Sequence, residues 1–156
     1  WSSDVCSSDL NLAEELRPVV ETFRSVHPGV SWEFEAAAMP PVWFDPFQIR
    51  RAVINLLENA AAALGGRGKV VVRIGHEPTL GTVRVSVRDD GPGIPAGDRD
   101  RLFEPYFSRQ EGGTGLGLAI VSAIASDHGG TVKVGDNMPT GAVFEIEFPV
   151  HPKGKE

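Results

Sequence analysis

Apolar residues recur along this chain with two different periods, and the periods separate helices from strands. From Asn11 to Val26 they return every three or four positions, as on one face of an amphipathic helix, and His27-Pro28-Gly29 ends the pattern. Another helix is expected from Thr114 to Asp127, closed by Gly129-Gly130. Alternation with period two predicts strands elsewhere. These are Ser31–Glu35, Val70–Ile74, Val83–Val87, Thr131–Val134 and Val143–Phe148.

The longest predicted helix runs from Asp45 to Leu64 and carries signals at both ends. Asp45 is a typical N-cap residue, Pro46 suits the first helical position, and Gln48 would complete a capping box. Gly65-Gly66 ends the helix. Hairpin-linked strands beside a few helices predict an α+β domain, in which helices cover one face of a single sheet.

The composition predicts one globular domain and argues against a nucleic-acid-binding surface. A chain of 156 residues with 41% hydrophobic and 23% charged residues is ordinary for one domain. The net charge is −6 without a Lys/Arg run, so we expect no nucleic-acid partner. The single cysteine, Cys6, excludes an internal disulfide. We interpret residues 1–10 as a non-native or disordered leader, residues 11–150 as the domain, and residues 151–156 as a disordered tail.

The longest predicted helix also carries two asparagines on a face of its own. Asn55 and Asn59 lie one helical turn apart, and Ala52, Ala62 and Ala63 fall on or beside the same stripe. Asparagine is a mediocre residue inside a helix, so two of them among alanines indicate a surface kept open for a ligand. Amide oxygens suit Mg²⁺, which shares its ligation with water and phosphates. The alternative is a pair of solvated side chains.

A carboxylate follows the apolar row of the strand Val83–Val87. Period two sends Asp89 to the same side as the valines, where an unpaired carboxylate would cost several kcal/mol. The amino group of a nucleobase would be a suitable partner, and Gly91 and Gly93 would let the backbone pass close to a flat ring. The alternative is an aspartate that caps a turn, a role that Asp90 could share.

A second glycine-rich stretch opens the last predicted helix. Gly112–Leu118 would present backbone N–H groups and a helix dipole to an anion, but it matches neither a Walker loop nor a dinucleotide fingerprint. The alternative is a flexible loop. Ile94–Glu111, between the two glycine sites, has little regular structure and is expected to be a lid. Arg99, Arg101 and Arg109 could reach phosphates from it, or could be solvated surface charges.

Four segments, taken in order, resemble the signature boxes of sensor histidine kinases. They are the N box (Asn55–Ala60), the first glycine box (Asp89–Ile94), the F box (Leu102–Phe107) and the second glycine box (Gly113–Leu118). The resemblance covers about Asn11 to Val150, and its closing part is similar to the nitrogen-regulation branch of these kinases. It implies a two-layer α/β sandwich of the Bergerat type, with a mixed sheet, helices on one face and a lid over ATP.

The same resemblance implies roles for individual residues. Asn59 would bind Mg²⁺, Asn55 would support the metal or the phosphates, and Asp89 would accept a hydrogen bond from the adenine amino group. The other residues implied in binding ATP are Gly91, Gly93, Ile94, Phe103, Gly113, Thr114, Gly115, Leu116, Gly117 and Leu118.

Two positions depart from the family pattern. Many members carry a basic or aromatic residue shortly after the N box, where this chain has Ala62 and Ala63, so Arg109 is the candidate cation for the transferred phosphoryl group. Asp90 replaces the more usual asparagine and is expected to point away from the base. Glu58 would either orient the phosphoacceptor or face solvent.

The resemblance implies an enzyme, a histidine kinase that transfers the γ-phosphoryl group of Mg-ATP to a histidine and acts indirectly on a response regulator. None of the 4 histidines stands in the family's acceptor context, a helical histidine followed by an acidic residue with a proline nearby. We therefore expect a separate phosphoacceptor domain before Asn11, in a homodimeric parent protein that is cytoplasmic or membrane-anchored. The catalytic domain itself is expected to be cytoplasmic and monomeric.

Two other functions would use the same pocket. The first is a gyrase-like ATPase or an anti-sigma serine kinase. Gyrase-like ATPases carry an acid where Asn55 stands, and an amide cannot act as the base that activates water. The second is a non-catalytic ATP-binding sensory module, which the intact glycine boxes and both asparagines argue against.

Overall fold

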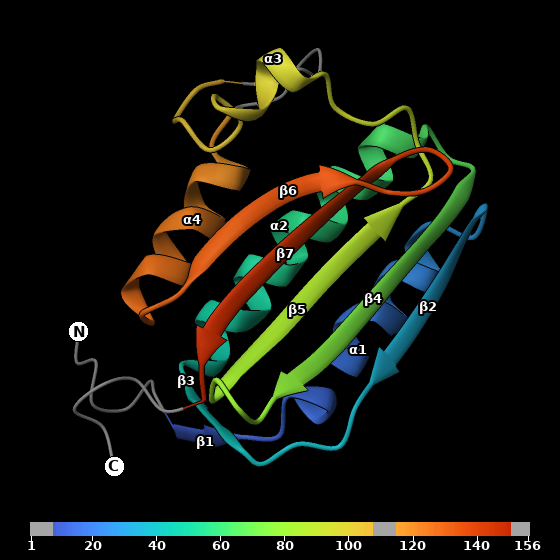
Figure 1. The fold of residues 1–156 in the computed structure, drawn as a ribbon. Helices are drawn as coiled ribbons and strands as arrows, with labels where there is room; N and C mark the ends of the chain where they lie inside the picture. The colour runs from blue at the N-terminus through green and yellow to red at the C-terminus, as the bar shows by residue number, and fades with distance from the viewer. Residues whose placement is uncertain (1–7, 108–114, 151–156) are drawn as a thin grey trace.

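A five-stranded sheet forms one layer of the molecule, and helices form the other (Figure 1). The computed structural model describes residues 8–107 and 115–150. The spatial order of the sheet is β2-β4-β5-β7-β6, in which β2 runs parallel to β4 and the other neighbours are antiparallel. The expected mixed sheet is therefore confirmed. Its strands are β2 (Val30–Ala36), β4 (Gly68–Glu77), β5 (Thr82–Asp89), β6 (Thr131–Asp136) and β7 (Ala142–Pro149).

The three longer helices lie on one face of the sheet, as expected, and they are α1 (Leu12–Val26), α2 (Pro46–Leu64) and α4 (Gly117–Asp127) (Figure 1). The short α3 (Ala96–Arg99) lies beyond the sheet, at the top of Figure 1. The ends of α1 and α2 agree with the sequence. No helix in the described parts of the chain is long and apolar enough to cross a membrane.

The start of α4 was predicted wrongly. The helix begins at Gly117 rather than at Thr114, because Gly115 has a φ of +74° and cannot continue a right-handed helix. A Cβ at Gly115 would also lie 2.4 Å from the backbone of Tyr106. Packing against the lid therefore fixes where this helix starts.

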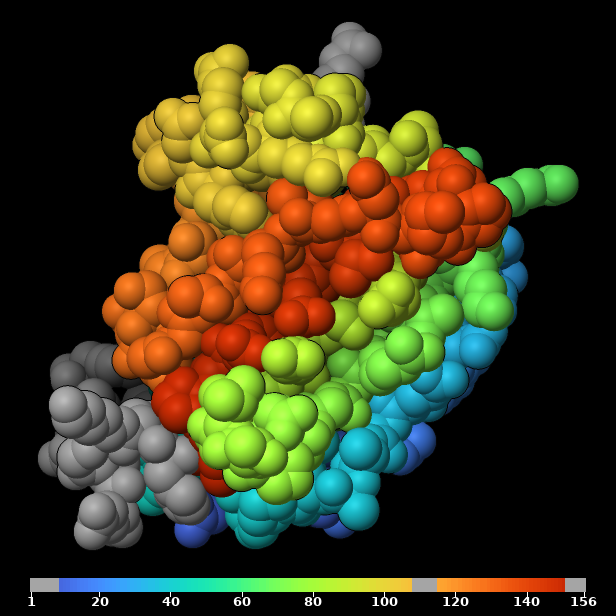
Figure 2. All heavy atoms as spheres, viewed as in Figure 1, coloured from blue at the N-terminus to red at the C-terminus, as the bar shows by residue number. Residues whose placement is uncertain are grey.

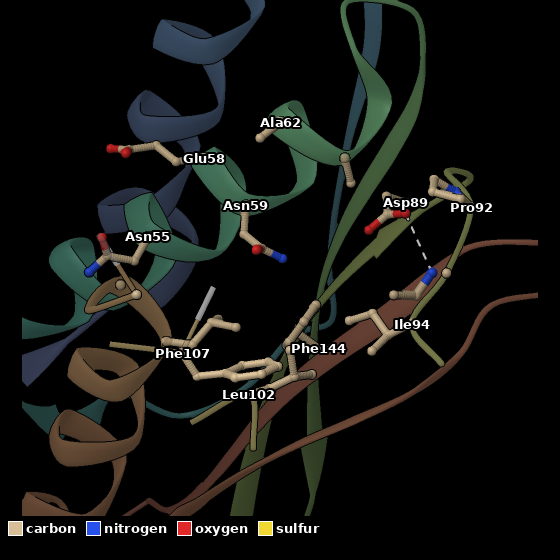
Figure 3. Close-up of a pocket in the computed structure, with 16 residues that line it drawn as sticks. Asn55, Glu58, Asn59, Ala62, Asp89, Pro92, Ile94, Leu102, Phe107 and Phe144 are labelled. Atoms are coloured by element: carbon tan, nitrogen blue, oxygen red, sulfur yellow. Dashed lines mark hydrogen bonds between the residues drawn. The ribbon is translucent and has the colours of Figure 1, made fainter. Parts of the chain in front are cut away.

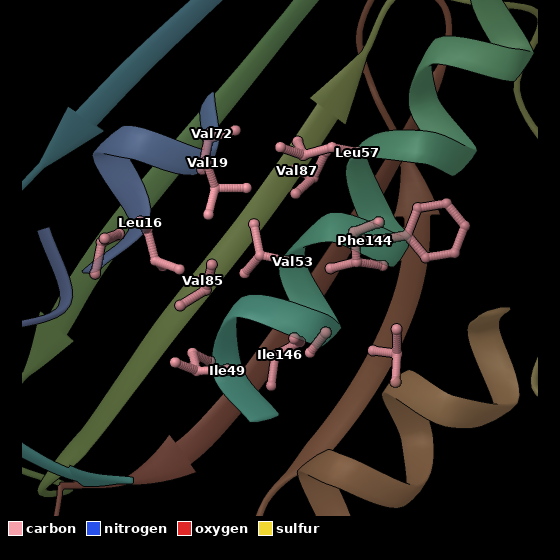
Figure 4. Packing of buried hydrophobic residues seen from close by; sticks show 14 of the residues in the cluster. Leu16, Val19, Ile49, Val53, Leu57, Val72, Val85, Val87, Phe144 and Ile146 are labelled. Carbon is pink, nitrogen blue, oxygen red and sulfur yellow. The ribbon is translucent and has the colours of Figure 1, made fainter. Parts of the chain in front are cut away.

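The hydrophobic core lies between the sheet and the helices (Figure 4). Val85 and Val87 of β5 meet Val53 and Leu57 of α2, and all four are fully buried. Burying each such side chain contributes roughly 1.5–3 kcal/mol. The opposite face of the sheet is polar and carries cross-strand ion pairs such as Arg73 with Glu35 and Arg84 with Glu147. One buried and one solvated face are typical of a largely antiparallel sheet.

A small second sheet joins the N-terminal segment to the domain. β1 (Ser8–Leu10) pairs antiparallel with β3 (Val42–Phe44), and Leu10 is buried. We had expected no element before Asn11. A strand of three residues is too short to show a period, so only its pairing partner reveals it. Cys6 lies outside the described residues.

The N-terminus of α2 is held by a buried aspartate. Oδ1 of Asp45 accepts hydrogen bonds from the N–H groups of Phe47 at 2.9 Å and Gln48 at 3.4 Å. The predicted capping box is wrong in its second half, because the Asp45 N–H donates to Nε2 of His128 at 3.4 Å instead of to Gln48. His128 also stacks on Phe44, so it is structural, as expected.

Asp45→Ala should lower the free energy of unfolding by about 1–2 kcal/mol, because it removes the acceptor for two N–H groups of α2. Asp45→Asn should lose much less, since its amide oxygen can still accept. Urea denaturation of the purified domain measures both. Gln48→Ala is the matched control in the same helical turn, and a loss as large as that of Asp45→Ala would contradict this account of the cap.

Candidate functional site

A cavity of about 500 Å³ opens beside α2 at the carboxyl end of β5 (Figure 3). Helix α2 forms one wall, the first glycine-rich loop forms one end, and the N-terminus of α4 lies at the other. Figure 2 shows the yellow lid segment as a separate lobe above the sheet. The lining residues are Asn55, Glu58, Asn59, Ala62, Ala63, Asp89, Pro92, Gly93, Ile94, Leu102, Phe107, Gly115, Gly117, Leu118, Ala142 and Phe144.

The wall from α2 is the polar stripe predicted from the sequence. Asn55 and Asn59 both line the cavity, and Figure 3 shows Asn59 extending into it while Glu58 extends away. Ala62 lines the cavity too. Ala52 does not, because it is fully buried in the hydrophobic core. One turn before Asn55, the predicted stripe is therefore part of the core and no longer of the cavity wall.

A buried carboxylate stands at the glycine-rich end. Asp89 is only 2% exposed, and its Oδ1 accepts hydrogen bonds from the N–H groups of Gly91 at 3.0 Å and Ala142 at 3.4 Å, the latter dashed in Figure 3. Burial raises the pKa of Asp89 above its ordinary value, and the two N–H groups only partly offset this. Both bonds use Oδ1, so Oδ2 remains available to a ligand.

The neighbouring Asp90 points away from the cavity, as expected. Its Oδ1 accepts a hydrogen bond from the Lys69 N–H at 2.8 Å, which ties the glycine-rich loop to the first residues of β4. The two aspartates therefore have separate tasks. One faces the cavity and the other fastens the loop to the sheet.

The opposite end of the cavity is the N-terminus of α4. The N-cap residue Leu116 supplies no capping side chain. At Gly117, the first helical residue, a Cβ would lie 3.7 Å from Oδ1 of Asn55. The positive end of the helix dipole thus lies next to an amide from α2. This combination suits an anion such as phosphate.

The lid segment supplies apolar side chains to the cavity. Leu102 and Phe107 line it, whereas Phe103 packs edge-on against Phe144 with ring centroids 6.3 Å apart. The Tyr106 N–H donates to the Gly115 carbonyl at 2.8 Å, so the lid's end touches the start of the second glycine-rich stretch.

The two described lid arginines have partners of their own and do not line the cavity. Arg99 forms an ion pair with Asp136 and donates to the Ile94 carbonyl. Arg101 lies over the ring of Phe107 at 4.4 Å. Arg109, the third candidate cation, is outside the described residues.

The structure brings most of the residues proposed from the sequence to one cavity. Among the described candidates, Gly91, Phe103 and Leu116 do not line it, while Gly113 and Thr114 lie outside the described residues. Sequence reasoning missed Ala142 and Phe144, which come from β7. The sequence shows only an alternating strand pattern here, and that pattern does not indicate that the first residues of β7 line a ligand cavity.

The chemistry of this cavity fits a nucleotide. An apolar slot can hold a flat ring, a carboxylate can accept from its amino group, and the N-terminus of α4 at the far end can meet phosphates. The described residues contain no cluster of three or more His, Cys, Asp and Glu that could hold a metal alone. An ion here would therefore need phosphate and water ligands, as Mg²⁺ prefers.

Residues 44–152 match the family model described as histidine kinase-, DNA gyrase B-, and HSP90-like ATPase. The chain belongs to this family. It is 40% identical over 127 residues to the sensory histidine kinase/phosphatase NtrB of Rhodobacter capsulatus, and 35% identical over 131 residues to the nitrogen regulation protein NtrY of Azorhizobium caulinodans. These matches cover 74% and 81% of this chain.

The catalytic domain of the histidine kinase ThkA has a similar structure. The TM-score is 0.85 at 34% identity, and the match covers 94% of this chain and 97% of that one. The chain is accordingly a histidine kinase catalytic domain, and its family binds ATP. It spans 36% of the length of NtrB and 17% of that of NtrY.

Asp89→Asn should weaken ADP binding by about tenfold or more if Oδ2 accepts from the adenine amino group, because the substitution would remove a charged acceptor. IDP, which has a carbonyl at that position, should lose less, so the ADP-to-IDP affinity ratio should fall. Isothermal titration calorimetry measures both. A variant that keeps the wild-type ratio would remove Asp89 from base recognition.

The same substitution should not destabilise the nucleotide-free domain. The raised pKa of Asp89 means that the folded chain holds this proton more tightly than the unfolded chain. The contribution of Asp89 to the free energy of unfolding therefore falls as pH rises through that pKa. Asparagine does not ionise, so the variant does not lose stability in this way. Thermal unfolding at neutral pH should give a midpoint equal to or above that of the wild type.

Proposed function

We propose that this domain binds Mg-ATP and transfers the γ-phosphoryl group to a histidine on a separate phosphoacceptor domain. The observation that carries the proposal is that the two ends of the cavity differ, with buried Asp89 at one end and the N-terminus of α4 beside Asn55 at the other. A nucleotide would therefore bind in one orientation, with its base near the end of β5 and its phosphates near the N-terminus of α4.

At the base end, Asp89 would accept a hydrogen bond from the adenine amino group through Oδ2. The ring would lie in the slot between Ile94 and Phe144, which line the cavity from the glycine-rich loop and β7. Gly93, which also lines the cavity, would pass close to the ring with its backbone at a φ of +81°, a conformation that favours glycine.

At the phosphate end, Asn59 would bind Mg²⁺ and Asn55 would support the metal or the phosphates. The bound metal would neutralise charge on the phosphates, which phosphoryl transfer requires more than covalent help. Gly115, Gly117 and the preceding Gly113 and Thr114 would meet the phosphates with backbone N–H groups. Asn59 extends from α2 into the cavity (Figure 3), and this direction supports the assignment.

The transferred group would be stabilised from the lid by Arg109. Arg99 and Arg101 are held by other partners, which leaves Arg109 as the candidate. Glu58 lies at the rim of the cavity on α2 and points outward (Figure 3), a position from which it would orient the incoming histidine rather than hold the nucleotide.

Transfer rather than hydrolysis is favoured by the residue types at the phosphate end. Asn55 is an amide and cannot take a proton from water. Among the described residues, the carboxylates that line the cavity are Asp89, at the base end, and Glu58, which points away (Figure 3). A gyrase-like ATPase would need an acid where Asn55 stands.

The partners would be those of a two-component pathway. The chain is shorter than its relatives, so the acceptor histidine would lie in another part of a homodimeric parent protein. The longer ThkA structure, 31% identical over 96% of this chain with a TM-score of 0.81, is described as a complex with the response regulator TrrA. By analogy, a response regulator would receive the phosphoryl group from the acceptor histidine of this protein.

Asn59→Ala should weaken ADP binding by about tenfold with Mg²⁺ present and much less in EDTA. The reason is that the lost amide would act on the metal rather than on the nucleotide. Calorimetry in both buffers tests this, with Ala62→Ser, on the same wall of α2, as the matched control. An equal loss in EDTA would remove Asn59 from the metal.

Given ATP labelled on the γ-phosphate, the domain alone should neither label itself nor release appreciable phosphate. Adding the separately produced histidine domain of the same polypeptide should give labelling that rises with its concentration. The rate should stay far below that of the joined protein, where the effective concentration is on the order of millimolar. Arg109→Ala should slow transfer more than it weakens ATP binding.

The labelled product should be acid-labile and base-stable, as a phosphorylated histidine is. Acid-stable labelling of a serine on the added domain would overturn the histidine kinase proposal in favour of the serine kinase alternative.

A further inference from the structure

The turn that joins β6 to β7 lies against the first glycine-rich loop. In Figure 1 this orange-red turn reaches the carboxyl end of β5 at the upper right. It contacts alternate residues of the loop. Its residues touch the carbonyls of Asp89 and Gly91, and a Cβ at Gly93 would lie 3.2 Å from the Gly141 carbonyl. The base end of the cavity therefore rests on this turn.

Asn137 makes the central contact. Its Nδ2 donates to the Asp89 carbonyl at 2.9 Å. The pairing of β5 with β7 ends at Arg88 opposite Val143, so Asp89 is the first residue of β5 beyond that ladder. The side-chain amide of Asn137 takes the place of a strand partner for this carbonyl.

The turn holds Asn137 in a defined place. The Asn137 N–H donates to the Gly141 carbonyl at 3.0 Å, which closes the turn. Gly141 has a φ of +111°, and a Cβ there would lie 1.8 Å from the Asp89 carbonyl oxygen. Thr140 adds a hydrogen bond from its hydroxyl to the Gly91 carbonyl at 2.8 Å. Only glycine allows this approach, so the turn is built around the Asp89 peptide.

The two sides of Asp89 are thus held by the same short segment. Its carbonyl is fixed by Asn137, and Oδ1 of its carboxylate accepts from the Ala142 N–H, at the end of the same turn. A change at Asn137 would let the peptide rotate and would turn Oδ2 away from a bound base. Asn137 itself does not line the cavity.

We propose that Asn137 is a positioning residue for base selectivity, which holds Asp89 in the orientation that distinguishes adenine from a 6-oxo purine. The inference rests on the proposed role of Asp89 in reading adenine. It extends that role to a residue that does not line the cavity and whose effect should be confined to the base end.

The experiment compares Asn137→Ala and Asn137→Asp with the control Met138→Ala, whose side chain is 82% exposed in the same turn. Calorimetry gives affinities for ADP, IDP and inorganic tripolyphosphate. Asn137→Ala should weaken ADP by about tenfold and reduce the ADP-to-IDP ratio, since one hydrogen bond to a buried carbonyl is lost. Tripolyphosphate should bind all variants as it binds the wild type.

Asn137→Asp should lose at least as much, although its shape is the same. A carboxylate cannot donate to the Asp89 carbonyl, and it brings a second negative charge next to a buried one. Met138→Ala should behave as the wild type with all three ligands. Circular dichroism and thermal unfolding without ligand establish that each variant is folded.

Two outcomes would overturn the inference. The first is a wild-type ADP-to-IDP affinity ratio in both Asn137 variants. If Asp89→Asn still lowers that ratio, this outcome leaves the proposed function intact. An equal loss for ADP and tripolyphosphate would show that Asn137 supports the whole domain rather than the base end. If Asp89→Asn itself keeps the ratio, the adenine assignment fails, independently of Asn137.

Discussion

The buried carboxylate of Asp89 is the constraint around which the ligand end of this domain is arranged. It continues a row of fully buried valines on β5, where a charge without partners is costly. Three other features follow from it: the loop at Gly91 that turns back to donate, the start of β7 at Ala142, and the turn that supplies Asn137. These contacts satisfy one oxygen and the backbone while leaving the other oxygen to a ligand. The cost of burying the second oxygen is therefore not offset within the protein, and a bound ligand could offset it.

The N-termini of α2 and α4 differ, and the difference separates structure from function. Asp45 caps the N-terminus of α2 with its own side chain and is itself buried, with its N–H donating to His128. At the N-terminus of α4 the N-cap residue Leu116 makes no side-chain cap hydrogen bond, and Gly117 lines the cavity. The carboxylate of Asp45 occupies the positive end of the α2 dipole, whereas the positive end of the α4 dipole faces the cavity.

Helix α2 separates the hydrophobic core from the cavity and so couples stability to binding. Val53 and Leu57 on one side pack on β5, while Asn55 and Asn59 on another side line the cavity. Because the same helix turns carry both sets, packing of Val53 and Leu57 on the core also sets the positions of Asn55 and Asn59 at the cavity wall.

Local patterns in the sequence determined the element types, the one-sided sheet, the cap at Asp45, the stacked pair Asn55 and Asn59, and the inward direction of Asp89. Each depends on period or on neighbours within a few residues, which a linear sequence displays. The start of α4, the strand Ser8–Leu10, the burial of Ala52 and the contact of Asn137 with Asp89 were decided only by tertiary structure. Each depends on a partner outside its own element: the backbone of Tyr106 for Gly115, β3 for β1, the core for Ala52, and the end of β5 for Asn137. A local sequence pattern does not identify the partner that an element will contact, because the packing of the layers decides which segments meet.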